Sequence, residues 1–176
     1  DLLESRGLGD VYKRQAGNPV IYKPAEQTSA IGLQMFEALV DAGVPTDVLH
    51  FLPGDGAEVG AHLVKHPDVA MITFTGSKDV GVKILEQAGK LEKDQGFVKN
   101  CVIEMGGKNA TIIDADADLD EAVPGVVYSA FGFQGQKCSA TSRVIVVGSA
   151  YEAFTQRLAE VIEGLRVGGG HDPMYD

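Results

Sequence analysis

The sequence has few cysteines, few cations and no long apolar run, and each scarcity argues against a class of protein. Its 176 residues include two cysteines, which make no disulfide framework and favour a reduced, cytoplasmic setting. Fifteen Lys and Arg against 25 Asp and Glu give a formal net charge of −10 without a basic stripe, so we expect no nucleic-acid partner. No stretch is long and apolar enough to span a bilayer, and no signal-peptide pattern is present, so we expect no membrane partner.

What the sequence does contain is a regular alternation of strand and helix patterns. Strands are predicted at 19–23, 48–52, 69–76, 101–105, 110–114 and 143–147, and helices at 28–42, 57–65, 78–90, 119–131 and 151–165. Within 28–42, Ile31, Met35, Leu39 and Ala42 follow one another at spacings of three and four and form one apolar face. Such alternation is typical of an α/β fold with a parallel sheet.

The two ends of the sequence and one glycine pair suggest its organisation. Residues 1–15 lack helical and strand periodicity, and we interpret them as a foreign segment, such as a cloning or sequencing scar; a frayed native terminus is the alternative. Gly106 and Gly107 break the chain after a strand, so we place a domain boundary there and predict domains at 16–105 and 106–176. The last residues, GGGHDPMYD, are turn formers with no closing element, as in a truncated chain.

Two segments carry side chains suited to covalent catalysis. Cys138 lies in FQGQKCSA, where small and polar neighbours make poor core context and the charge of Lys137 favours the thiolate. From residue types alone, a nucleophile and a small buried hydrophobe remain equally open for Cys138. Glu104 ends an apolar strand in IEMGGKN, where a partly desolvated carboxylate suits a general base and a strand-end salt bridge is the alternative. Cys101 lies in the apolar strand and is predicted to be a core residue.

These two segments and three others resemble the aldehyde dehydrogenase superfamily. IEMGGKN is similar to its glutamate motif and FQGQKCSA to its cysteine motif, and the 34 positions between Glu104 and Cys138 also match. The other segments, in the order the family has them, are GNPVIYKPAE (17–26) for the ribose-binding strand, PGDGAEVG (53–60) for a glycine-bearing turn and FTGSKDVG (74–81) for the pyrophosphate loop. The resemblance runs from about Ala16 to the end of the sequence and covers a middle portion of a family member.

The resemblance implies a fold and a set of catalytic roles. The fold would be part of a Rossmann-like NAD-binding domain followed by the start of an α/β catalytic domain. Cys138 would attack the aldehyde carbon, and its backbone N–H would supply half of an oxyanion hole. Glu104 would activate the water that hydrolyses the thioester. The parent enzyme would be a homo-oligomer.

The resemblance also implies the cofactor residues, and NAD as the cofactor. Lys23 and Glu26 would bind the adenosine ribose, and the carboxylate of Glu26 favours NAD over NADP because it repels a 2′-phosphate. Gly76 and Ser77 would contact the pyrophosphate at a helix N-terminus. The other cofactor residues would be Val80 and Gly56 on the adenine side and Gly106 beside the nicotinamide. GDGAEVG is not a GxGxxG fingerprint, because its third glycine comes one residue late.

The residues beside Cys138 suggest the substrate. SAFGFQGQKCSA (129–140) most resembles the family members that oxidise L-glutamate γ-semialdehyde to glutamate in proline breakdown. The resemblance implies that Lys137 and Ser139 contact the substrate carboxylate. A cation beside a hydroxyl suits an anionic substrate. The alternative is that Lys137 tunes the thiol or faces solvent.

Two apparent metal motifs are weak, and we assign no metal site. HLVKH places His62 and His66 four residues apart but lacks the glutamate of HExxH. The acidic run at 114–121 has Leu119 where a calcium loop needs glycine and Gly125 where it needs glutamate. A helix start fits better, with Asp118 as N-cap and Glu121 completing a capping box.

Several functional alternatives stay open. The parent protein could be another semialdehyde dehydrogenase, for example one for succinate semialdehyde, or the C-terminal module of a bifunctional proline-oxidising enzyme. A CoA-acylating relative is disfavoured because such enzymes lack the glutamate base. A non-catalytic nucleotide-binding remnant is the alternative from another class. We expect these 176 residues alone to be poorly folded and to have no dehydrogenase activity.

Overall fold

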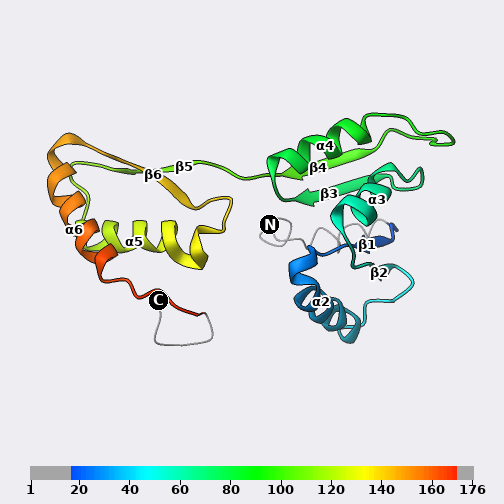
Figure 1. Ribbon diagram of the computed structural model, residues 1–176, viewed down its shortest axis with the longest axis horizontal. Helices are drawn as coiled ribbons and strands as arrows, with labels where there is room; N and C mark the ends of the chain where they lie inside the picture. Colours follow the sequence, from blue (N-terminus) through cyan, green and yellow to red (C-terminus); the bar gives the residue numbers. More distant parts are fainter. Residues whose placement is uncertain (1–16, 170–176) are drawn as a thin grey trace. The chain divides into compact units, whose positions relative to one another are not determined.

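Strands and helices alternate along residues 17–169, which are the residues described by the computed structural model (Figure 1). The strands are β1 (Val20–Tyr22), β2 (Leu49–Phe51), β3 (Met71–Thr75), β4 (Asn100–Glu104), β5 (Asn109–Ile113) and β6 (Thr141–Val146). The helices are α2 (Ser29–Asp41), α3 (Ala61–Lys65), α4 (Lys78–Ala88), α5 (Leu119–Phe131) and α6 (Tyr151–Glu163), with shorter helical turns η2 (Glu26–Thr28), η3 (Gly56–Gly60), η4 (Gly132–Gly135) and η5 (Gly148–Ala150). Each predicted strand and helix is confirmed, and the interpretation of residues 1–15 lies outside the described part of the chain.

The strands form three pairs, β1–β2, β3–β4 and β5–β6. β1–β2 and β5–β6 are parallel, with Val20 opposite Leu49 and Ile113 opposite Val146. In β3–β4 the Asn100 N–H donates to the Ala70 carbonyl where both strands begin, and the two strands therefore start side by side. The predicted α/β class with parallel strands is confirmed.

The chain divides into two compact units, and the division does not follow the sequence alone. The first unit contains the described residues up to Phe74 together with Val82–Ile103. The second contains Thr75–Gly81 and the chain from Glu104 onward. The short segment Thr75–Gly81 therefore belongs with the later half of the chain, while the functional boundary at 105/106 stays a prediction.

In the first unit, α2 approaches the β1–β2 pair closely at Gly32, and the Phe36 ring lies 5.7 Å from that of Phe51 in β2. Ile31 and Met35 of the predicted apolar face are exposed, whereas Gly32 is buried. A Cβ atom on Gly32 would lie 2.9 Å from the Pro24 Cβ atom, which shows how closely the helix approaches the chain after β1. The apolar spacing identified the helix, and the close approach at Gly32 decided which side of it packs.

The second unit has its own core, in which α5 and α6 lie on one side of the β5–β6 pair (Figure 1). The buried side chains of this core are Ile113, Val123, Val126 and Phe154. Phe154 is 1% exposed and is one of the two largest fully buried side chains of the described residues. This core supports the chain on both sides of Cys138, because α5 precedes that residue and β6 follows it.

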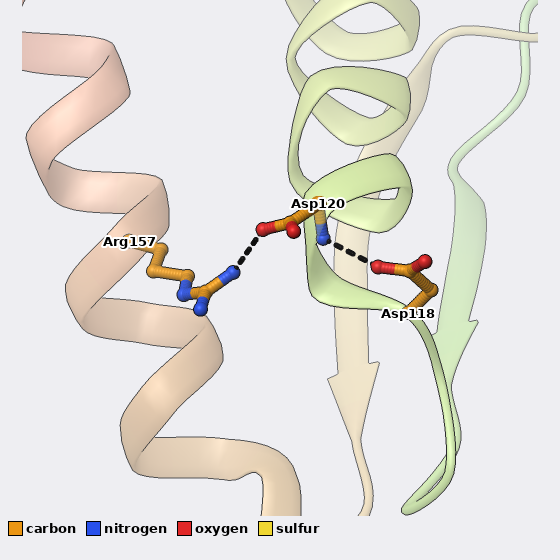
Figure 2. Close-up of polar contacts among 3 residues, drawn as sticks. All are labelled: Asp118, Asp120 and Arg157. Carbon is orange, nitrogen blue, oxygen red and sulfur yellow. Dashed lines mark hydrogen bonds and ion pairs between the residues drawn. The ribbon is translucent and has the colours of Figure 1, made fainter.

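The start of α5 has half of the predicted capping box. The Asp118 carboxylate accepts a hydrogen bond from the Asp120 N–H at 2.9 Å, so Asp118 is the N-cap as predicted (Figure 2). Glu121 makes no hydrogen bond to the Asp118 N–H in the described structure, so the reciprocal half of the box is wrong. Asp120 instead pairs with Arg157 of α6 at 2.5 Å, and this exposed ion pair contributes little to stability (Figure 2).

Candidate active site

Cys138 lies in a tight turn between α5 and β6, and its side chain is exposed. The Ala140 N–H donates to the Lys137 carbonyl at 3.2 Å, which closes a turn with Cys138 and Ser139 at its centre. Exposure in a turn of small residues fits the predicted nucleophile better than a buried structural cysteine. Ser139 is exposed beside it.

The chain enters this turn through a left-handed segment. Phe133, Gln134 and Gly135 have φ values of 56°, 58° and 67°, and only the last of them is a glycine. Left-handed backbone is unfavourable for residues with a Cβ atom and is found preferentially at functional sites. The segment reverses the chain after α5 and brings Lys137 and Cys138 to the turn.

Glu104 is the last residue of β4, and its side chain is exposed. The expected partial desolvation is therefore wrong for this chain. The reason is the alternation along β4, where Cys101 and Ile103 are half-buried while Val102 and Glu104 face the other, exposed side. No ion pair to Glu104 occurs within 17–169, so the structure does not support the salt-bridge alternative. An exposed carboxylate at a strand end remains able to accept a proton from water.

The backbone of Glu104 is joined to the predicted pyrophosphate loop. The Gly76 N–H donates to the Glu104 carbonyl at 3.0 Å, so these two predicted site residues lie side by side. Because that N–H is used, the remaining donors for an anion are those of Ser77 and the first turn of α4. The Ser77 hydroxyl accepts the Val80 N–H at 3.4 Å, which makes Ser77 the cap of this helix start.

Lys137 is drawn toward α5. Its ammonium nitrogen lies 4.7 Å from the centroid of the Tyr128 ring, within range of a cation–π interaction. A Cβ atom on Gly132 would lie 3.5 Å from the same nitrogen and 3.5 Å from the Tyr128 ring, so Gly132 leaves the space that both side chains use. Tyr128 was not predicted from the sequence. The available signal was an aromatic residue in the helix that precedes the turn containing Lys137.

In the first unit, the predicted ribose residues hold the glycine-bearing turn after β2. The Lys23 ammonium donates to the Gly54 and Pro24 carbonyls, each at 2.8 Å. A Glu26 carboxylate oxygen accepts the Gly56 N–H at 2.5 Å. Lys23 keeps one ammonium hydrogen and Glu26 keeps a second oxygen, and these are the donor and the acceptor that a ribose diol requires.

The conformation of this turn depends on a glycine and an aspartate whose roles were not predicted from the sequence. Gly54 has φ 154°, and a Cβ atom there would lie 2.6 Å from a Val59 methyl group. Asp55 caps η3 by accepting the N–H groups of Ala57 and Glu58 at 2.6 and 3.2 Å. Gly56 is thereby held where its N–H reaches Glu26, so the turn and the ribose residues form one local arrangement.

The remaining glycine of the prediction lies in the connection between β4 and β5. Gly106 is exposed, and a Cβ atom there would meet nothing within 4 Å. Its neighbour Gly107 is different, because a Cβ atom would lie 2.9 Å from the Cys138 carbonyl oxygen. Asn109, two residues on, donates its side-chain amide to that same oxygen at 2.6 Å. The structure therefore brings the glutamate segment and the cysteine segment into direct contact.

Cys101, Lys99 and the histidines lie outside this arrangement. Burial raises the pKa of the Cys101 thiol, although the nearby Lys99 opposes the shift, so Cys101 stays a neutral half-buried thiol of β4. The His62 and His66 rings pack edge to face at 5.6 Å, and the His66 Nδ1 atom accepts the Asp68 N–H. No group of three potential metal-binding side chains gathers within the described residues. No helix in that part of the chain is long and apolar enough to cross a membrane.

The fold and the arranged segments define a member of a family of oxidoreductases. Residues 14–176 match the model of the aldehyde dehydrogenase family, and the chain belongs to that family. The resemblance that the five sequence segments indicated is thus confirmed.

Within the family, the chain is similar to enzymes of one type. It is 47% identical over 152 residues to the 1-pyrroline-5-carboxylate dehydrogenase of Geobacillus thermodenitrificans, covering 86% of this chain and 30% of that protein. A crystal structure of 1-pyrroline-5-carboxylate dehydrogenase from Thermus with bound NAD has a TM-score of 0.86 at 50% identity, covering 92% of this chain and 31% of that one.

A longer protein is equally similar. The crystal structure of proline utilization A from Bdellovibrio bacteriovorus, inactivated by N-propargylglycine, has a TM-score of 0.87 at 51% identity, covering 91% of this chain and 17% of that one. The chain spans about 30% of the length of the curated relatives it matches. The activity of a whole protein containing it is therefore a matter for proposal.

Proposed function

We propose that this chain is the part of an NAD-dependent aldehyde dehydrogenase that carries the nucleophile and the base, and that its substrate is L-glutamate γ-semialdehyde, formed from 1-pyrroline-5-carboxylate. The observation that carries the proposal is the 47% identity over 152 residues to a 1-pyrroline-5-carboxylate dehydrogenase. The exposed Cys138 turn and its contact with the segment after Glu104 support it.

The reaction begins and ends at Cys138. Its thiolate adds to the aldehyde carbon and forms a thiohemiacetal, and the Cys138 N–H stabilises the negative oxygen. NAD, when bound, supplies the acceptor for the hydride that leaves this carbon. The thioester that remains on Cys138 is hydrolysed by water that gives a proton to Glu104, which releases the carboxylic acid and the thiol.

Lys23 and Glu26 of the first unit fit the adenosine ribose of NAD. Lys23 and Glu26 each keep hydrogen-bonding capacity after holding the Gly54–Gly56 turn, so they can bind the two ribose hydroxyls. The charge of Glu26 opposes a 2′-phosphate and favours NAD over NADP. Ser77, Val80 and the first turn of α4 would face the pyrophosphate and adenine side, and Gly106 the nicotinamide.

The substrate carboxylate would be bound by Lys137 and Ser139. Both flank the nucleophile in the same exposed turn, so an anionic group on the substrate would lie beside the attacking sulfur. The Lys137 ammonium lies 4.7 Å from the centroid of the Tyr128 ring of α5, and this contact restricts where its charge can lie.

The test is NADH formation by the complete gene product that contains this chain. Glutamate γ-semialdehyde, succinate semialdehyde and acetaldehyde are offered separately, with Cys138→Ala as the inactive variant and Cys101→Ala as the matched cysteine control. We expect strong preference for glutamate γ-semialdehyde, abolished only in Cys138→Ala. Better turnover of another aldehyde would refute the substrate, and full activity of Cys138→Ala would refute the nucleophile.

A second candidate is favoured by the similarity to proline utilization A, of which this chain covers only 17%. In that case the gene product would be a bifunctional protein that also oxidises proline. Proline-dependent reduction of an electron acceptor by the same purified gene product would support this candidate, and dehydrogenase activity without it would exclude the bifunctional protein.

A further inference from the structure

Asn109 connects the two segments that carry the proposed catalytic residues. It is the first residue of β5, five positions after Glu104, and its side-chain amide donates to the Cys138 carbonyl at 2.6 Å. The same amide lies 3.5 Å from the Ala140 carbonyl, at the edge of hydrogen-bonding range. One side chain therefore bridges toward two carbonyls of the nucleophile turn.

An irregularity in the β5–β6 pair lies beside this contact. Asn109 lies opposite Thr141, but the register shifts between Asn109 and Ala110, so Ala110 lies opposite Arg143. Ser142 of β6 is thus the extra residue of a bulge, and bulges are frequent next to active sites. The described pairing of β5 with β6 begins at Thr141, so the Cys138 and Ala140 carbonyls lie before the ladder, and the amide of Asn109 takes the place of a ladder donor.

Gly107 makes the same approach possible from the other side. A Cβ atom on Gly107 would lie 2.9 Å from the Cys138 carbonyl oxygen and 3.1 Å from the Asn109 amide nitrogen. Any larger residue at 107 would push the carbonyl and the amide apart. The glutamate segment thus binds the Cys138 carbonyl through the Asn109 amide, and Gly107 leaves the space that this carbonyl occupies.

We propose that Asn109 is a positioning residue for the Cys138 nucleophile, acting through the carbonyl of Cys138. A fixed carbonyl fixes the plane of the 138–139 peptide and the position of the Cys138 α-carbon. Restricting this peptide narrows the directions in which the thiol and the Cys138 N–H can point. Asn109 touches no reacting atom, and its role rests on the function proposed above for Cys138.

The experiment compares Asn109→Ala, Asn109→Asp and Asn109→Gln in the complete gene product. Asn109→Ala removes the donor, Asn109→Asp replaces it by a carboxylate facing carbonyl oxygens, and Asn109→Gln keeps an amide donor on a longer side chain. Four quantities are measured: kcat and KM with the preferred aldehyde, the alkylation rate of Cys138 by iodoacetamide across pH, and the unfolding temperature. The alkylation rate of Cys101 in the same samples is the internal control.

We expect kcat to fall roughly tenfold in Asn109→Ala, the equivalent of one net hydrogen bond. In Asn109→Asp it should fall roughly a hundredfold, as for a misplaced catalytic group. KM and the Cys101 alkylation rate should stay within about twofold, the pH profile of Cys138 alkylation should change, and Asn109→Gln should recover part of the lost kcat.

Two results would overturn the inference. Wild-type kcat and wild-type Cys138 alkylation in both Asn109→Ala and Asn109→Asp would show that the contact does not position the nucleophile. A fall in kcat matched by a lower unfolding temperature, with equal changes in Cys101 alkylation and no recovery in Asn109→Gln, would show a merely structural role. If wild type is inactive on every aldehyde, the proposed function fails, and the alkylation profiles still decide whether Asn109 positions Cys138.

Discussion

Two glycines ten residues apart, one in the left-handed segment before Cys138 and one in α5, should respond in opposite ways to substitution by alanine. Gly135 has φ 67°, and a Cβ atom there would lie 2.8 Å from the Ala130 carbonyl oxygen, closer than carbon and oxygen can approach. Gly125 lies in the middle of α5, where a Cβ atom would meet nothing within 4 Å. The same substitution, glycine to alanine, should therefore destabilise the protein at 135 and stabilise it at 125.

The magnitudes follow from backbone conformation. Alanine at 135 incurs about 1–2 kcal/mol for the left-handed conformation. The smaller unfolded-state entropy returns about 0.4–1 kcal/mol, and the contact with Ala130 adds a further penalty, so we expect a net loss of about 1 kcal/mol or more. Alanine at 125 should raise the free energy of unfolding by about 0.5–1 kcal/mol, because a glycine in a helix interior is unfavourable by that amount.

The assay is thermal unfolding of the two variants of the complete gene product, with amide hydrogen exchange of 119–140 as the local readout. Gly135→Ala should lower the unfolding temperature and the protection of the residues after α5, and Gly125→Ala should raise protection within α5. Cys138 alkylation should change in Gly135→Ala alone. An unchanged or higher stability of Gly135→Ala would refute the left-handed conformation at this position and the close contact with Ala130.

Three further predictions concern the cation–π contact of Lys137, the core of the second unit, and the shifted pKa values of Lys99 and Cys101. Tyr128→Leu should raise KM for glutamate γ-semialdehyde about twofold to fivefold by removing the ring under Lys137, whereas Tyr128→Phe keeps the ring and should leave KM unchanged; equal effects of the two would refute the cation–π contact. Phe154→Ala should lower the free energy of unfolding by about 3–5 kcal/mol because the side chain is 1% exposed in the second core, and a loss under about 1 kcal/mol in urea unfolding would contradict that burial. Burial lowers the pKa of Lys99 and raises that of Cys101, so Lys99 makes stability rise as pH climbs toward its ordinary value of about 10.4, while Cys101 makes it fall above about 8.5. In urea titrations from pH 8 to 10.5, Lys99→Met should therefore lose stability more steeply than wild type and Cys101→Ala less steeply, and parallel curves would show that neither pKa is shifted.

Element positions were predictable because they depend on neighbouring residues. Apolar spacing and the N-cap at Asp118 predicted α5 at Leu119–Phe131 with the bounds that the structure has. The strands follow apolar runs bounded by glycine and polar residues, so their centres were predicted and only their ends moved by one or two residues. The close approach of α2 at Gly32 was not predicted, because a glycine at a close helix contact has no apolar signal of its own.

The details of the candidate site were less predictable, for two physical reasons. Phe133 and Gln134 adopt a left-handed conformation that their residue types disfavour, so tertiary structure overrides local preference there. The contacts that hold the site join positions far apart in sequence: 29 residues separate Asn109 from Cys138, and 31 separate Lys23 from Gly54. A sequence motif can indicate that such residues matter, but hydrogen-bonding partners at that separation depend on the fold.

The turns that carry the predicted site residues are fixed mainly by polar contacts, and this changes how their variants should be read. Exposed turns at strand ends have few apolar neighbours, so a hydrogen bond has to set their geometry. Glu26 shows the consequence, because one of its oxygens accepts the Gly56 N–H while the other is the proposed ribose acceptor.

Glu26→Ala would release the turn and remove the proposed ribose acceptor together, so lost NAD affinity in that variant cannot be assigned to the ribose contact. Glu26→Gln separates the two, since its amide oxygen still accepts the Gly56 N–H while the negative charge is gone. With the charge removed and the turn kept, the ratio of kcat/KM for NADP over NAD should rise at least tenfold, with the unfolding temperature unchanged. An unchanged ratio in Glu26→Gln would mean that this carboxylate does not face the 2′ position, and it would leave Glu26 with the structural role alone.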